Sequence, residues 1–163
     1  MLTDLQQACA KAGSDRRGVV RELVATRTDG RTKMYVTMTA LQYRRTHAAL
    51  FLNGSYVPIE SGGSKKDHVC AFARLDETQS AVVVVPRLLG GLVPDADTPP
   101  IGPEIWQDTW ISLPAGSTEH GPTRYRHLFT GEVLSSDSVE DRNTFSVAHL
   151  FNDCPVALLE RLA

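Results

Sequence analysis

The spacing of hydrophobic residues changes near residue 50, and this change constrains the fold more than any other feature of the sequence. Before it, apolar residues recur at helical intervals, whereas after it they alternate or form short runs bounded by Gly, Pro, Asn or Asp. A period near 3.6 predicts amphipathic helices and a period of 2 predicts strands. We therefore predict an α+β fold, with helices over residues 1–50 and an antiparallel β-sandwich domain over residues 51–163.

The clearest predicted helix begins after Asp29, whose side chain can cap its first turn. Its apolar residues Met34, Tyr35, Met38 and Leu41 form one stripe. Because an apolar helix face must be covered, we expect the β-sandwich to pack against this stripe.

Several strands are predicted after the helices. Tyr56–Glu60 contains Pro58, which lacks a backbone donor and therefore belongs at a sheet edge. His68–Leu75 and Ala81–Val85 are predicted as neighbouring strands joined by a hairpin connection, the second of them central because of its β-branched run.

Two segments in the second half of the chain give further predictions. Arg124–Phe129 and Glu132–Leu134 are predicted to pair as strands on either side of a Thr-Gly turn. Asp137, Glu140 and Asp141 lie among Ser and Asn residues and are predicted to form a solvated loop.

Composition excludes several classes of function. The 163 residues include 17 Lys and Arg against 19 Asp and Glu, which gives a net charge of −2. A chain with this charge has no electrostatic attraction to nucleic acid or to an anionic membrane. No apolar run approaches the roughly 20 residues of a membrane span. The first residues lack the pattern of a signal peptide, so we expect a cytoplasmic protein that binds neither membrane nor nucleic acid.

The cysteines and histidines predict no disulfide framework, metal site or cofactor. Cys9, Cys70 and Cys154 are far apart in the sequence, and Cys70 lies in an apolar run that predicts a buried thiol. The histidines occur without the spacing of metal ligands; they are His47, His68, His120, His127 and His149. A thiol enzyme built on Cys70 and His68 is a further hypothesis, since two residues apart on a strand share a face.

Trp106 and Trp110 are the candidate substrate-binding residues. Residues at i and i+4 of a strand lie on one face, so the two indoles can form a platform for sugar rings. The alternative is that one or both indoles pack against the helices. No pattern in the sequence predicts a catalytic residue.

One set of segments resembles a known family. These segments are Asp29–Val36, Ala40–Arg45, His47, Leu50–Phe51, Asn53–Glu60, Asp67–Arg74, Ala81–Leu88, Trp110–Pro114, Thr130–Glu132 and Pro155–Leu159. In this order they resemble the C-terminal region of maltooligosyltrehalose synthase, an isomerase of glycoside hydrolase family 13 in the alpha-amylase superfamily. The first of them is similar to the last barrel helix of that enzyme, and Asn53–Glu60 to the first strand of its C-terminal domain.

The resemblance implies a function in trehalose biosynthesis. The family converts the reducing-end α-1,4 linkage of a maltooligosaccharide to α,α-1,1, using carboxylates on barrel strands that match no segment of this sequence. It therefore implies a non-catalytic C-terminal fragment, inactive alone, whose partners are the barrel domain of the same enzyme and a maltooligosaccharide. The alternative is an autonomous carbohydrate-binding β-sandwich module.

Overall fold

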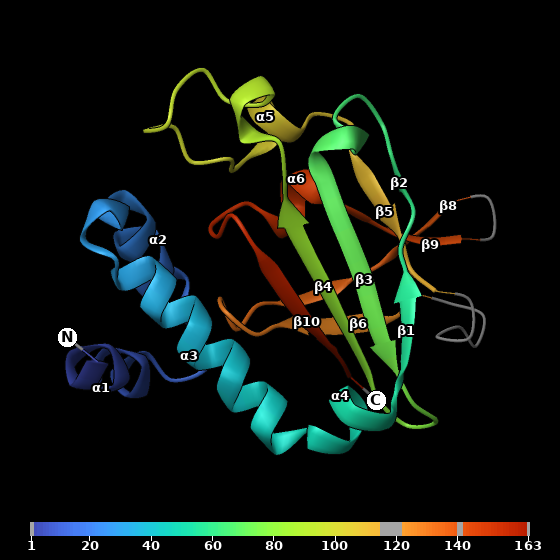
Figure 1. The fold of residues 1–163 in the computed structure, drawn as a ribbon, viewed down its shortest axis with the longest axis horizontal. Helices are drawn as coiled ribbons and strands as arrows, with labels where there is room; N and C mark the ends of the chain where they lie inside the picture. Colours follow the sequence, from blue (N-terminus) through green and yellow to red (C-terminus); the bar gives the residue numbers. More distant parts are fainter. Residues whose placement is uncertain (1, 115–121, 140–141, 163) are drawn as a thin grey trace.

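A computed structural model describes residues 2–114, 122–139 and 142–162, and it has helices followed by antiparallel sheets (Figure 1). The first helices are α1 (Leu2–Ala12), α2 (Arg17–Ala25), α3 (Arg31–Thr46) and α4 (Ala48–Asn53). Two short helices, α5 (Pro103–Trp106) and α6 (Val147–Leu150), lie among the strands. No helix in the described ranges has the length and apolar character needed to cross a membrane.

Within the described residues the strands form two antiparallel sheets, a six-stranded sheet in the order β1-β3-β4-β10-β6-β7 and a four-stranded sheet in the order β2-β5-β9-β8. The strands are β1 (Ser55–Pro58), β2 (Ser61–Gly62), β3 (Val69–Leu75), β4 (Ser80–Pro86), β5 (Trp110–Ser112), β6 (Arg124–His127), β7 (Val133–Ser135), β8 (Asp137–Val139), β9 (Arg142–Ser146) and β10 (Ala157–Arg161). The predicted α+β class with a β-sandwich is confirmed.

The strongest strand predictions are confirmed in detail. β3 and β4 pair antiparallel with Phe72 opposite Val83, and β4 lies between β3 and β10 in the interior of the larger sheet. β1, which contains Pro58, is an edge strand, as the missing donor of proline requires. β6 and β7 pair on either side of Thr130 and Gly131.

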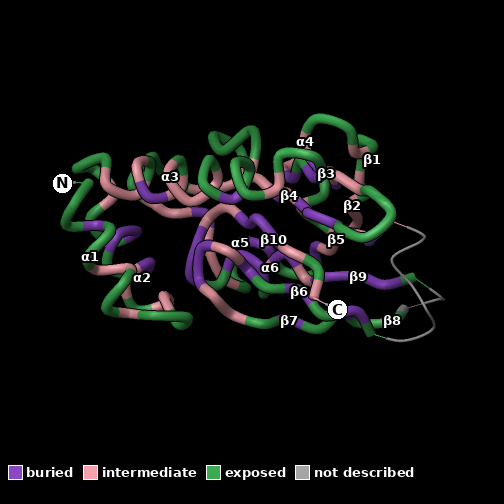
Figure 2. The backbone as a smooth tube through the Cα atoms, turned by 90° about the horizontal axis from the view of Figure 1, so that it is seen from below, coloured by how far each residue is buried: buried purple, intermediate pink, exposed green. Residues whose placement is uncertain are grey.

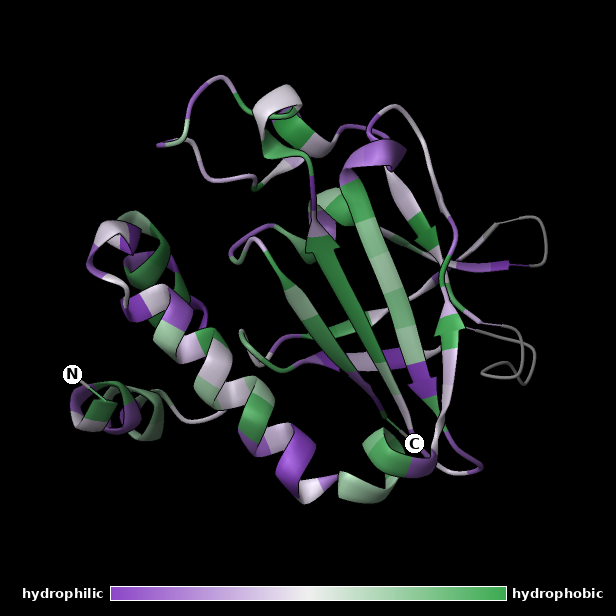
Figure 3. Cartoon of the chain, viewed as in Figure 1, coloured by the Kyte–Doolittle hydropathy of each residue, from purple (hydrophilic) through white to green (hydrophobic). Residues whose placement is uncertain are grey.

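Two hydrophobic cores lie on opposite faces of the larger sheet. Val82 and Val84 of β4 face Ile111 and Phe145 of the smaller sheet, whereas Ala81 on the other face of β4 packs with the helices. The alternation of side chains along a strand produces this division. In Figure 3 the hydrophobic colour runs along β4, and Figure 2 shows the buried residues concentrated in the strands. The division into two separate domains stays a prediction.

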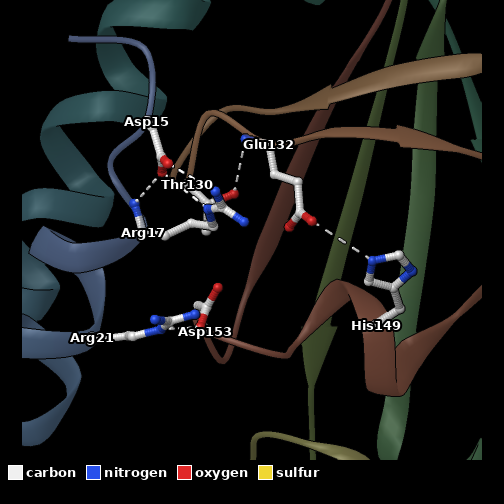
Figure 4. A network of polar contacts seen from close by, with 7 residues as sticks. All are labelled: Asp15, Arg17, Arg21, Thr130, Glu132, His149 and Asp153. Carbon is white, nitrogen blue, oxygen red and sulfur yellow. Dashed lines mark hydrogen bonds and ion pairs between the residues drawn. The ribbon is translucent and has the colours of Figure 1, made fainter. Parts of the chain in front are cut away.

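Polar contacts also join the helices to the β-sandwich (Figure 4). The Nε of Arg21 in α2 donates to Oδ1 of Asp153 at 2.6 Å, and Asp153 is only 5% exposed. The backbone N–H of Arg16 donates to the carbonyl oxygen of Thr130. Gly131 has a φ of 81°, and a Cβ there would overlap the carbonyl oxygen of Ser14, so glycine allows this close approach.

The predicted apolar stripe of the third helix needs correction at Leu41 and at Tyr43, because Tyr35 is buried and Met34 and Met38 pack at the edge of the same core. The residues of α3 that the structure buries are Tyr35 and Tyr43, whereas Met34 and Met38 are half-buried and Leu41 is 57% exposed. Tyr35 donates its hydroxyl hydrogen to the carbonyl oxygen of Phe129 at 2.5 Å, and this bond lets a polar aromatic residue lie in the core.

Two smaller predictions also need correction. Asp137 begins strand β8 rather than lying in a loop, while Glu140 and Asp141 lie outside the described residues. Cys70 is exposed, because Val69, Ala71 and Ala73 occupy the inward positions of β3. The apolar neighbours of Cys70 in the sequence therefore do not surround its side chain.

Candidate functional site

The outer face of the smaller sheet carries an aromatic residue beside a hollow. In β5, Ile111 is fully buried against the larger sheet, so Trp110 on the opposite face of the strand points outward and is half-buried. Trp110 pairs with Gly62 of β2, and a Cβ at Gly62 would overlap the indole ring. The absence of a side chain at Gly62 therefore lets the indole lie across the neighbouring strand.

Polar side chains surround Trp110 in a hollow of about 640 Å³. Its lining includes Asp108, Trp110, Asp137, Arg142, Thr144 and Ser146, and we call these residues the Trp110 hollow. They gather because antiparallel pairing sets Trp110 opposite Ser146, and Asp137 opposite Thr144. The volume falls within the range of roughly 300–1,000 Å³ that small-molecule sites occupy.

Asp108 is fixed at the edge of the hollow. Ser64 donates to its Oδ1 from both the hydroxyl, at 2.6 Å, and the backbone N–H, at 2.9 Å. These bonds lower the pKa of Asp108 below its usual value, because they stabilise the charged form. The second oxygen, Oδ2, takes part in neither bond.

Arg142 supplies the positive charge of the hollow. Its Nη1 lies 3.4 Å from Oε2 of Glu60, and both side chains are more than half exposed, at 60% and 78%. An exposed pair of this kind contributes little to stability, so the guanidinium can exchange this partner for another at small cost.

Trp106 does not share a platform with Trp110. It lies in α5 rather than on a strand and is fully buried, with Nε1 donating to the carbonyl oxygen of Pro100 at 2.8 Å. Its ring meets Phe151 edge-on at a centroid distance of 5.1 Å. The structure therefore corrects the geometry expected for the pair, and contact with sugar stays a prediction for Trp110.

The residues considered for a thiol enzyme, His68 and Cys70, do not share a strand face. His68 ends a short 3₁₀ helix (Lys66–His68) instead of sharing a strand face with Cys70, and its Nδ1 lies 3.2 Å from the carbonyl oxygen of Leu88. In the part of the chain that the structure describes, no group of three or more His, Cys, Asp or Glu residues is arranged to hold a metal ion.

A second surface lies on the helices. A groove of about 810 Å³ runs between α1 and α3, and its lining includes Leu2, Lys33, Met34, Met38, Leu41 and Arg45. We call this the helix groove. It contains Met34, Met38 and Leu41 of the apolar stripe that the sequence predicted, whereas Tyr35 of that stripe is buried in the core shared with the larger sheet.

Sequence reasoning missed most residues of the Trp110 hollow. The available signal was weak: Arg142, Thr144 and Ser146 are polar residues at every second position, but Asn143 is polar as well, and only Phe145 gives the apolar alternation that is typical of a strand with one solvated face. The acidic residues before it suggested a loop and hid the pattern.

Comparisons with known proteins agree with the resemblance expected from the sequence. No family model matches the chain. Two putative maltooligosyl trehalose synthases from strains of Mycobacterium tuberculosis are each 33% identical over 129 residues, which is 79% of this chain. The chain spans only 14% of the length of these curated relatives.

One solved structure agrees with this relationship, and a second shares the fold. A mutant maltooligosyltrehalose synthase from Arthrobacter ramosus matches 88% of the chain with 26% identity and a TM-score of 0.57, over 17% of its own length. A maltogenic alpha-amylase from Thermotoga neapolitana shares the fold over 77% of the chain, with 14% identity and a TM-score of 0.50. The chain is thus homologous to part of a maltooligosyltrehalose synthase, and the match fits its C-terminal region.

Proposed function

We propose that this chain is the non-catalytic C-terminal part of a maltooligosyltrehalose synthase and that it supports a catalytic barrel domain outside its own sequence. In this proposal the barrel domain carries the family 13 isomerase chemistry of trehalose biosynthesis in the cytoplasm. The chain contributes a rigid β-sandwich and helices that dock against the barrel.

The helix groove carries this proposal. Its lining combines apolar Leu2, Met34, Met38 and Leu41 with polar Gln6, Thr37 and Gln42, and its charged residues Lys33 and Arg45 are both basic. The matched 129 residues make up 14% of each curated relative, so most of a relative lies outside the matched part, and in this proposal a domain of that kind covers the groove. We expect the covering surface to be apolar with acidic residues at its edge.

The chemistry of the Trp110 hollow supports a non-catalytic role. Cleavage of a glycosidic bond requires one carboxyl group to act as a general acid, which demands a raised pKa. Asp108 has the opposite property, because Ser64 lowers its pKa and keeps the carboxylate charged.

The test combines genetics with an assay. The reading frame upstream of Met1 is sequenced, and the barrel domain encoded there is produced separately. Maltohexaose is then incubated with the chain, with the barrel domain and with both, and the loss of reducing ends is followed. We expect conversion only in the mixture.

Matched variants locate the contact. Leu41→Asp places a charge in the helix groove and should abolish reconstitution, whereas Leu52→Asp, at a residue of α4 that is 73% exposed, should have no effect. Conversion by the chain alone would contradict the non-catalytic role. Equal behaviour of the two variants would contradict docking through the groove.

The second candidate function is an autonomous carbohydrate-binding module. The observation that favours it is the Trp110 hollow, which combines an outward aromatic residue with charged and hydroxyl side chains. If no barrel domain binds the chain and maltohexaose still does, this function replaces the first.

A further inference from the structure

We propose that the Trp110 hollow is a saccharide-binding site, in which one sugar ring stacks on the indole while Asp108, Asp137 and Arg142 bind its hydroxyl groups. The assignment of an α-glucan as the ligand rests on the proposed function. The assignment of a saccharide rests on the residues of the hollow alone.

The indole of Trp110 is held in a fixed position. It lies across Gly62, and any side chain at that residue would overlap the ring, so the strand beneath supports the indole directly. The same half-buried residue also lines the hollow. An aromatic ring fixed in this way offers apolar contact area with little loss of conformational entropy, which suits the C–H face of a pyranose ring.

The polar residues of the hollow match a ligand with many hydroxyl groups. Carboxylates of Asp108 and Asp137 accept hydrogen bonds, and the guanidinium of Arg142 donates them. Thr144 and Ser146 add hydroxyl groups that do either. Two carboxylates and one guanidinium line the hollow, so it disfavours an anionic ligand, and a neutral polyhydroxylated ligand can donate to the carboxylates and accept from the guanidinium.

Local backbone strain positions one of these groups. Gln107 has a φ of 49°, a value that favours glycine, in a turn closed by a 3.0 Å bond from the N–H of Thr109 to the carbonyl oxygen of Trp106. The Ser64 hydroxyl, which donates to Asp108, also has its oxygen 2.9 Å from Oε1 of the Gln107 side chain. This turn places Asp108 at the hollow, two residues before Trp110 in the chain.

The experiment titrates the full chain with maltohexaose, using calorimetry and intrinsic tryptophan fluorescence. The only other tryptophan is Trp106, which is fully buried, so a fluorescence change on binding reports on Trp110. We expect saturable binding, weakened at least tenfold in Trp110→Ala and severalfold in Asp137→Asn and Arg142→Gln.

The matched control is Tyr56→Ala. Tyr56 is an aromatic residue of the larger sheet, 58% exposed and stacked on Phe72, but outside the hollow. We expect this variant to bind maltohexaose as the unaltered chain does. Circular dichroism verifies folding, and if Trp110→Ala does not fold, the two polar variants at exposed residues decide the outcome.

Several results would overturn the proposal. They are the absence of binding to millimolar maltohexaose, equal weakening by Tyr56→Ala and Trp110→Ala, and unchanged binding in both polar variants. Equal affinity for cellohexaose would overturn the assignment of an α-glucan. Failure of the barrel domain to reconstitute activity, with maltohexaose binding intact, would instead count against the proposed function alone.

Discussion

His127 is buried as a neutral residue in the larger sheet. It is 1% exposed, its Nδ1 accepts a 3.4 Å hydrogen bond from the N–H of Thr130, and its ring meets Phe129 edge-on. Burial lowers its pKa to about 4, because the charged ring loses its hydration, and this effect exceeds the opposing influence of the Leu150 backbone and of Asp153. Folding is therefore coupled to pH through this residue.

The chain should lose stability as the pH falls from about 6.5 to about 4. In this range the unfolded state binds a proton at His127 and the folded state does not, so the free energy of unfolding falls by about 3 kcal/mol. Asp15, Asp29, Asp76 and Asp108 have pKa values lowered from 3.8, so their contributions disappear only at more acidic pH. Urea denaturation at several pH values measures the effect.

The variant His127→Gln should flatten this dependence between pH 6.5 and 4. The control His149→Gln changes a side chain that is 57% exposed and should retain the dependence of the unaltered chain. An unchanged slope in His127→Gln would show that another group is responsible.

At the scale of the element, α3 has two apolar faces with different roles. Tyr35 and Tyr43 belong to the core that the helices share with the larger sheet. The ring of Tyr43 also packs against the ring of His47 at a centroid distance of 4.1 Å. Nε2 of His47 lies 3.5 Å from Oε1 of Glu160 in β10. The other face, with Met34, Met38 and Leu41, lines the helix groove.

The two faces should respond differently to truncation. Tyr35→Ala should reduce the free energy of unfolding by about 3–5 kcal/mol, because it removes a buried ring and leaves the Phe129 carbonyl without its hydroxyl partner. Leu41→Ala should change it by about 0.5 kcal/mol or less, since that side chain is mostly exposed. Equal effects in chemical denaturation would contradict the orientation of α3.

At the scale of the whole molecule, the helices and the larger sheet depend on each other. Leu158 of β10 and Ala81 of β4 are buried in a core with Val20, Leu23 and Tyr35 of the helices. Contacts of Arg21 with Asp153 add polar links between the same parts (Figure 4). Along β4 and β10, both faces of the larger sheet are therefore apolar and covered.

A chain shortened to residues 54–163 should aggregate or lose cooperative unfolding. Removal of α1–α4 would expose the apolar face of β4 and β10, and exposed patches of this kind promote association. Size-exclusion chromatography and binding of a hydrophobic dye test this expectation. A monomeric fragment with cooperative unfolding would show that the β-sandwich is a separate domain, as the sequence predicted.

The sequence by itself determined the local structure. The alternation in β3 and β4, Pro58 at the edge, and the turn at Thr130 and Gly131 were predictable, because backbone geometry sets the side-chain period and the turn residues. The homology also followed from ordered local segments, which the relatives from Mycobacterium tuberculosis confirm.

Only the tertiary structure decided which side of each element is covered. In α3 the structure buries Tyr35 and Tyr43 and leaves Leu41 exposed, and Tyr35 bonds a carbonyl 94 residues away in the chain. Likewise, Trp106 is buried against Phe151 while Trp110 lies across Gly62, so two similar residues have different surroundings. Such choices depend on the free energy of long-range contacts, which periodicity within a single segment does not contain.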